Sequence, residues 1–151
     1  MIMDYSEKIS KQLNKLLVKN YDAEKSYLSA AENVENRTLI EFFVRKSVER
    51  RLFAQDIKKE ILRYGKEPKT SGSLMGDLHK ISMSLKAMFA SNNVDLILQE
   101  AVKRDVANLA KYNDVLKDRI LPTRIITLLV NQKNAIEIAI ASRKFEMKLV
   151  S

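Results

Sequence analysis

Apolar side chains recur along this chain at intervals of three and four residues, which is the spacing that places them on one face of an α-helix. Polar clusters, glycine or proline interrupt this pattern, and such residues are typical of helix ends. The pattern predicts five helices, over residues 4–33, 38–64, 74–89, 94–118 and 122–148. Four of them are long, and the third is short.

Residues suited to capping mark the ends of these helices. We expect N-terminal caps at Asp4, Thr38 and Asn92, because an acidic residue follows each of them three positions later. Gly65 is expected to end the second helix. Pro122 lies where a proline of the first turn is favoured, at the start of the last helix.

The lengths of the connections predict how the helices are arranged. The break between the first two helices is so short that they must be antiparallel neighbours. A long helix measures roughly 37 Å at 1.5 Å per residue, and the segment 66–91 is long enough to travel back over that length. We therefore expect an all-α, single-domain fold over residues 1–151, a four-helix bundle with one long crossover that contains a short extra helix.

The composition agrees with a helical domain. The chain has 151 residues, of which 46% are hydrophobic, with only 3 glycines and 2 prolines, so a turn-rich β fold is disfavoured. It has no cysteine, which excludes disulfides and thiolate metal sites. No apolar run approaches the roughly 20 residues that span a bilayer, and the first residues do not resemble a signal peptide. We expect a cytoplasmic protein without a membrane segment.

The crossover carries the most specific motifs. It contains Gly65-Lys66-Glu67-Pro68, Ser71-Gly72-Ser73-Leu74, Leu78-His79 and Leu85-Lys86. With these motifs the chain resembles a bacterial ferritin-like family of unknown function, and the similarity runs from about Tyr21 to Arg143. The resemblance implies a ferritin-like four-helix bundle. It implies no substrate and no particular metal.

Two positions at which ferritin-type bundles hold metal are altered. Such bundles build a two-metal centre from inward-facing glutamates and two Glu-x-x-His pairs. Here the comparable segments are Glu49-Arg50-Arg51-Leu52 and Glu137-Ile138-Ala139-Ile140, and neither has the histidine. We therefore expect no di-iron oxidase, no catalytic residue and no organic cofactor.

Four carboxylates remain candidates for a degenerate metal site. Glu24, Glu49 and Asp105 fall on apolar faces, and Glu137 flanks one. A buried carboxylate is costly unless it is paired, protonated or bound to a cation. One hypothesis is therefore a weak Fe or Mn site in a stress protein. The alternative is a buried polar network in which these acids pair with basic residues near the same faces, namely Lys46, Arg50 and Lys103.

His79 is the only histidine. A single imidazole cannot supply both missing pairs, so its role is limited to a packing contact on the crossover helix, one additional metal ligand or a pH-sensitive contact. The packing contact is the simpler interpretation.

The net charge of +8 raises the question of an anionic partner. Lys8, Lys11, Lys15 and Lys19 recur at helical spacing and form one basic stripe. A solvated helix face explains this stripe most simply, because no aromatic side chains are interleaved for base stacking. Association with DNA is the alternative.

The last helix suggests self-association. Ile126, Val130 and Ile140 are apolar positions that we expect to form a second face, which a single bundle does not need to bury. A homodimer would cover it. From the sequence we therefore expect a non-enzymatic bundle that acts through self-association or through an unknown protein partner.

Overall fold

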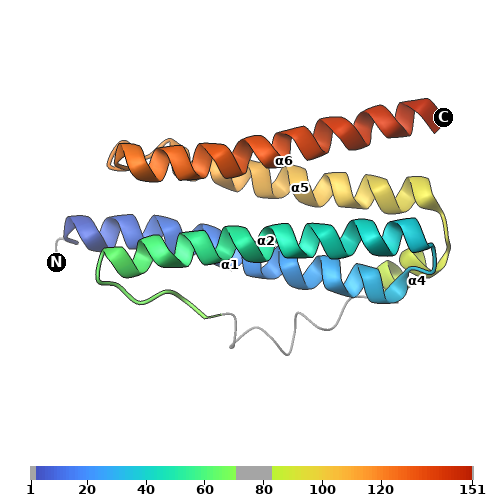
Figure 1. Ribbon diagram of the computed structural model, residues 1–151, viewed down its shortest axis with the longest axis horizontal. Helices are drawn as coiled ribbons and strands as arrows, with labels where there is room; N and C mark the ends of the chain where they lie inside the picture. Colours follow the sequence, from blue (N-terminus) through green and yellow to red (C-terminus); the bar gives the residue numbers. More distant parts are fainter. Residues whose placement is uncertain (1–2, 71–82, 151) are drawn as a thin grey trace.

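The computed structural model describes residues 3–70 and 83–150 of the chain. Within these residues it contains α-helices and no strand, so the predicted all-α fold is confirmed. The helices, labelled as in Figure 1, are α1 (Tyr5–Asn33), α2 (Arg37–Arg63), α4 (Met83–Ala90), α5 (Val94–Leu116) and α6 (Thr123–Val150). The predicted helix over 74–89 lies partly outside the described residues, and α4 is its described part.

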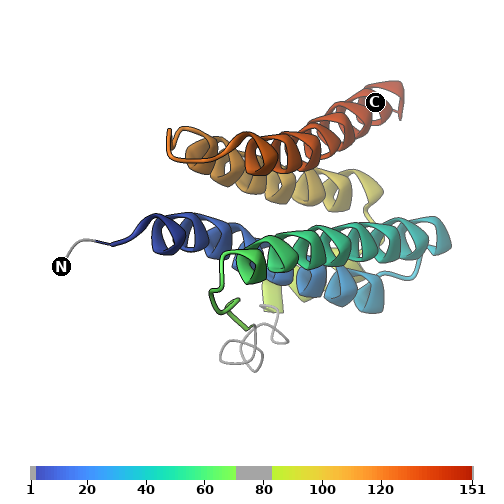
Figure 2. The same ribbon diagram turned by 60° about the vertical axis from the view of Figure 1, so that its left-hand side comes forward.

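The long helices form two antiparallel hairpins that lie one above the other (Figure 1). The first hairpin pairs α1 with α2 and the second pairs α5 with α6. Helices α2 and α5 run in the same direction, so the chain returns to the far end of the bundle between them, as the predicted crossover requires. Figure 2 shows the same two layers from another side, and α4 packs against α1 and α5 near the start of α5.

The caps at the first two helices show one prediction confirmed and one wrong. Asp4 caps α1, because its Oδ1 accepts a hydrogen bond of 2.8 Å from the backbone N–H of Glu7. Helix α2 is capped by Asn36, whose Oδ1 accepts from the backbone N–H of Leu39 at 3.1 Å. Thr38, the predicted cap, lies inside the first turn of α2. Asn36 lies two residues before Thr38, and its side chain accepts one of the backbone N–H groups that the first turn leaves free.

The cap of α5 is also displaced by one residue. Asn93 caps this helix, because its Oδ1 accepts a hydrogen bond of 3.2 Å from the backbone N–H of Leu96. The predicted cap, Asn92, has a positive φ of 58°, a left-handed conformation that asparagine tolerates better than most residues. Gly65 has a φ of 69° just after α2, so its predicted role at the end of that helix is confirmed.

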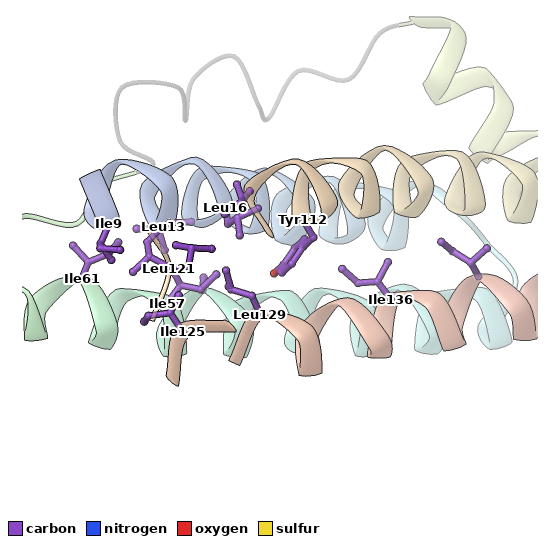
Figure 3. Packing of buried hydrophobic residues seen from close by; sticks show 14 of the residues in the cluster. Ile9, Leu13, Leu16, Ile57, Ile61, Tyr112, Leu121, Ile125, Leu129 and Ile136 are labelled. Carbon is purple, nitrogen blue, oxygen red and sulfur yellow. The ribbon is translucent and has the colours of Figure 1, made fainter. Parts of the chain in front are cut away.

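Two apolar clusters fill the bundle. One lies toward the start of α1, and Figure 3 labels ten of its side chains, which lie between α1, α2, α5, α6 and the segment before α6: Ile9, Leu13, Leu16, Ile57, Ile61, Tyr112, Leu121, Ile125, Leu129 and Ile136. The other lies near the α1–α2 connection and is rich in aromatic rings, with Tyr27, Phe42, Phe43 and Phe89. Some buried residues are polar, among them Asn20, Lys46, Arg50, Asp105 and Gln132.

Helix α6 differs from the prediction at one position. Ile140 is buried in the first cluster, so its predicted place on an outer face is wrong. Ile126 is exposed, as predicted, and Val130 is half-buried. Among the α6 side chains that the structure describes, residues 123–143, Ile138 is the most exposed apolar one, with 67% of its surface accessible.

A buried charge network at the bundle centre

Asp105 of α5 is the centre of a buried ion cluster. Its Oδ2 accepts from Lys46 Nζ at 2.7 Å, and its Oδ1 accepts from Arg50 Nη2 at 2.7 Å. The hydroxyl of Tyr27 also donates to Oδ1, at 2.5 Å. Asp105 and Arg50 are almost fully enclosed, with 1% and 0% of their surfaces accessible. Three helices, α1, α2 and α5, therefore meet at one carboxylate.

The cluster continues as a chain of hydrogen bonds into α6. Arg50 Nη1 lies 3.4 Å from Asn20 Oδ1, and Asn20 Nδ2 donates to the hydroxyl of Tyr112 at 2.9 Å. That hydroxyl donates to Gln132 Oε1 at 2.6 Å, and Gln132 Nε2 donates to the backbone carbonyl of Phe53 at 3.3 Å. All four long helices are thus joined by one polar network.

The charges of the cluster do not cancel within it. Lys46 and Arg50 are two buried cations beside one buried carboxylate. Glu49 adds a second, weaker counter-charge, because its Oε1 lies 4.0 Å from Lys46 Nζ. Among the described residues this buried oxygen has no hydrogen-bond donor. Removing such charges from water costs several kcal/mol per ion, which only close pairing offsets.

The two tyrosines of the network resist ionisation. Burial raises the pKa of Tyr112 to about 12, and the nearby Glu49 carboxylate acts in the same direction. Burial also raises the pKa of Tyr27, and the charge of Asp105 raises it further. Both hydroxyls are therefore neutral donors at any ordinary pH.

The predicted metal-ligand candidates occupy different environments. Asp105 is at the centre, whereas Glu49 is half-buried at its edge. Glu137 is exposed on α6 and pairs with Lys133 at 3.7 Å. His79 lies outside the described residues.

Glu24 is half-buried on α1. Burial raises the pKa of its carboxyl, and the positive charges of Arg51 and Lys25 act in the opposite direction. Among the described side chains, those of residues 3–70, 83 and 85–143, no group of three or more histidine, aspartate or glutamate residues could hold a metal ion. Metal ligation by the four carboxylates stays a prediction, whereas the alternative of pairing with Lys46 and Arg50 is what Asp105 does. The third predicted partner, Lys103, is exposed.

Several members of the network were not anticipated. Asn20 follows Leu13 and Leu16 at helical spacing, and this spacing is the signal that would have placed it inside. Glu60 is a buried acid of α2, and it accepts from Arg124 at 3.1 Å, which joins α2 to α6. The spacing of Glu60 after Ile57 gives the same signal.

The basic stripe of α1 borders a groove against the segment after α5. A hollow of about 330 Å³ is lined there by Met3, Lys8, Lys11, Gln12, Lys15, Asp118 and Ile120. Asp118 Oδ2 accepts from Gln12 Nε2 at 2.6 Å. This bond, a backbone N–H and the nearby lysines lower the pKa of the Asp118 carboxyl. Lys19 lines a separate hollow of about 140 Å³ between α1 and α5.

No helix in the described part of the chain is long and apolar enough to cross a membrane. The chain does not match any curated protein or any solved structure. Residues 8–118 match a family described as Domain of unknown function (DUF2383). The matched segment includes Tyr27, Lys46, Arg50 and Asp105, so the whole ion cluster lies within it. The chain belongs to the DUF2383 family.

Proposed function

We propose that this protein is a ferritin-like bundle that works as a non-enzymatic interaction scaffold, with an ion cluster where metal-binding relatives of such bundles hold their metals. The observation that carries this proposal is the pairing of Asp105 with Lys46 and Arg50 at 2.7 Å each. A carboxylate that is saturated by two cations has little affinity for a third.

The geometry of α2 supports the same proposal. Leu52 occupies the position of the histidine in a Glu-x-x-His pair, and 49% of its surface is accessible. A side chain there points away from the bundle centre, so even a histidine would not reach Asp105. The parallel course of α2 and α5, with the crossover between them, supports the ferritin-like arrangement.

Metal loading tests the proposal. Protein purified without chelators and then incubated with Fe(II) or Mn(II) is expected to hold far less than one metal ion per chain after desalting. Elemental analysis gives the metal content, and ferrous oxidation followed by absorbance gives the activity. One metal ion per wild-type chain that is lost in Glu49→Gln or Glu24→Gln would contradict the proposal. It would show that these carboxylates are metal ligands.

The scaffold role includes self-association through the outer face of α6. Between Arg124 and Arg143, the charged side chains of this helix are Lys133 and Glu137, which pair with each other. The exposed positions Thr127, Asn131, Asn134 and Ile138 are uncharged. A helix with so little exposed charge is suited to a buried position, and a two-fold dimer is the simplest way to cover it.

Sedimentation velocity tests the dimer. The wild-type chain is expected to sediment as a dimer at micromolar concentration, and Ile138→Glu to shift it to a monomer. Leu62→Glu is the matched control, because Leu62 is a similarly exposed apolar residue on α2. A monomeric wild-type chain, or equal effects of the two variants, would exclude α6 as the contact.

Association with nucleic acid is a second candidate, favoured by one observation. Lys8, Lys11 and Lys15 line the same groove, so their charges act on one surface. Binding through phosphates would weaken steeply with salt. Fluorescence anisotropy with a labelled DNA duplex should then show binding that is lost in Lys8→Glu/Lys11→Glu/Lys15→Glu and retained in Lys58→Glu/Lys59→Glu, which reverses exposed charges on α2. The absence of binding at low ionic strength would rule the candidate out.

A further inference from the structure

The hollow between α1 and α5 that Lys19 lines takes no part in the proposals above. Its polar lining consists of Lys19, Asp22, Ser26, Tyr27, Arg104 and Asn108. The short side chains of Ala23 and Ala107 leave the space between them open. Pockets for drug-sized ligands measure about 300–1,000 Å³. The volume here is about 140 Å³, so the hollow admits a ligand of only a few heavy atoms.

The hollow adjoins the buried ion cluster through two of its lining residues. The hydroxyl of Tyr27 donates to Asp105, and Asn108 Oδ1 accepts from Arg50 Nη1 at 3.3 Å. Asn108 Nδ2 also donates to the backbone carbonyl of Arg104 at 2.8 Å. These bonds hold this side of the hollow in place before a ligand arrives, which lowers the entropy lost on binding.

Arg104 supplies an oriented cation on the α5 side. Its Nη1 donates to Ser26 Oγ at 2.8 Å, and its Nε lies 3.3 Å from Glu100 Oε1. Nε is buried and makes no hydrogen bond among the described residues. A guanidinium has five N–H donors, so donors remain beyond the one that Ser26 accepts. Lys19 adds a second, exposed cation from α1. Together they suit a carboxylate, which an arginine binds through two parallel hydrogen bonds.

Asp22 supplies an acid on the α1 side of the same hollow. Burial raises the pKa of its carboxyl, whereas the charges of Lys19 and Lys25 on the same helix lower it. Among the described residues this carboxyl has neither a hydrogen bond nor an ion pair. Burial disfavours the charged form of an acid, and a cation bound beside the acid offsets this effect. An ammonium group offers both the positive charge and three N–H donors.

A ligand with one charge fits only part of this lining. A simple anion is attracted by Lys19 and Arg104 and repelled by Asp22, and a simple cation meets the reverse. A small amino acid carries both groups, a carboxylate and an ammonium separated by a single carbon atom, and its few heavy atoms match the volume.

We propose that this hollow binds a small amino acid, in the simplest case glycine, with its ammonium at Asp22 and its carboxylate at Arg104 and Lys19. The hydroxyl of Ser26, which accepts from Arg104, keeps its own O–H to donate to the same carboxylate. The proposal is independent of the scaffold role, because it concerns a different surface from the outer face of α6 and needs no second copy of the chain.

A titration of the isotope-labelled chain with glycine, followed by heteronuclear NMR at constant ionic strength, tests the site. We expect shifts of the backbone amides near Asp22 and Arg104 that saturate as one site per chain. Asp22→Asn and Arg104→Gln should each weaken binding by about tenfold or more, since each removes a charge-assisted hydrogen bond. Asp56→Asn and Lys103→Gln are the matched controls. Both change exposed residues outside the hollow and should leave the affinity unchanged.

Probes with a single charge define the ligand. Acetate lacks the ammonium and methylamine lacks the carboxylate, so each should bind the wild-type chain at least about tenfold more weakly than glycine. Asp22→Asn should narrow the difference between glycine and acetate, because the partner of the ammonium is lost. A general loss of structure would not produce this selective change. Ala107→Phe fills the hollow from an exposed position and should abolish binding while leaving the helical circular dichroism intact.

Four results would overturn the proposal. They are the absence of saturable shifts with glycine, equal binding of glycine and acetate by the wild-type chain, wild-type affinity in both Asp22→Asn and Arg104→Gln, and an equal loss in the two control variants. The first two use the wild-type chain alone, so the test holds even where a variant does not fold.

Discussion

Arg50 and Asp105 form an ion pair from which solvent is excluded, with Nη2 2.7 Å from Oδ1. Arg50 comes from α2 of the first hairpin and Asp105 from α5 of the second, so the pair joins the two layers of the bundle. Helices in apolar contact can slide a little past each other at low cost. Sliding that separates a buried ion pair leaves both charges without a partner, which costs several kcal/mol. The pair therefore fixes the register between the layers.

Asp105→Asn should destabilise the protein severely. The substitution leaves Lys46 and Arg50 buried without a counter-charge, and breaking a buried pair in this way costs about 3–5 kcal/mol. Urea unfolding followed by circular dichroism measures the free energy of unfolding. Glu137→Gln is the control, because it breaks an exposed pair on α6 and should cost less than about 1 kcal/mol. A similar loss in both variants would show that the central pair does not hold the layers together.

Replacing the whole cluster by apolar residues should be far milder. In Lys46→Met/Glu49→Gln/Arg50→Met/Asp105→Leu, with Tyr27→Phe to remove the hydroxyl that donates to Asp105, no buried charge is left without its partner. Such replacements are often neutral or stabilising. Thermal unfolding should therefore show a higher midpoint for this variant than for Asp105→Asn. If the midpoint were as low as that of Asp105→Asn, packing rather than charge would account for the loss.

The buried tyrosines should ionise late in an alkaline titration. The pKa of Tyr112 is raised to about 12 in the folded chain. Because the folded state holds this proton more tightly than the unfolded state, the resulting stabilisation is complete below pH 10 and is lost as the pH rises toward 12. Absorbance at the phenolate band should show a delayed component in the native protein that is absent in urea. Tyr112→Phe should reduce this component, and an undiminished component would assign it to other tyrosines.

The cap of α2 can be tested by a pair of alanine substitutions. Asn36→Ala removes the side chain that accepts from Leu39, so we expect a loss of about 1 kcal/mol. Thr38→Ala changes an exposed residue inside the first turn and should cost less, because it caps nothing. Equilibrium unfolding of both variants gives the comparison. The opposite order would restore Thr38 as the cap.

The helical periodicity and the few breaking residues of the sequence determined the number of long helices, the crossover and the buried position of Asp105. Local chemistry is enough for such features, because a helix repeats every 3.6 residues whatever packs against it. The N-caps of α2 and α5 were predicted at the wrong residues. Neighbouring residues compete for the same free N–H groups, and the backbone conformation decides between Asn36 and Thr38, or between Asn93 and Asn92.

Only the tertiary structure decided which charges meet. Glu49 and Arg50 are adjacent in the sequence and lie about 100° apart around α2. Either one can face the centre, depending on how the helix is rotated against its neighbours. In the folded chain Arg50 turns inward to Asp105, and Glu49 lies half-buried at the edge of the ion cluster. From the sequence, Asp105 was expected to be buried and to need a partner. The rotation of α2 against α5 decided that its partners are Lys46 and Arg50.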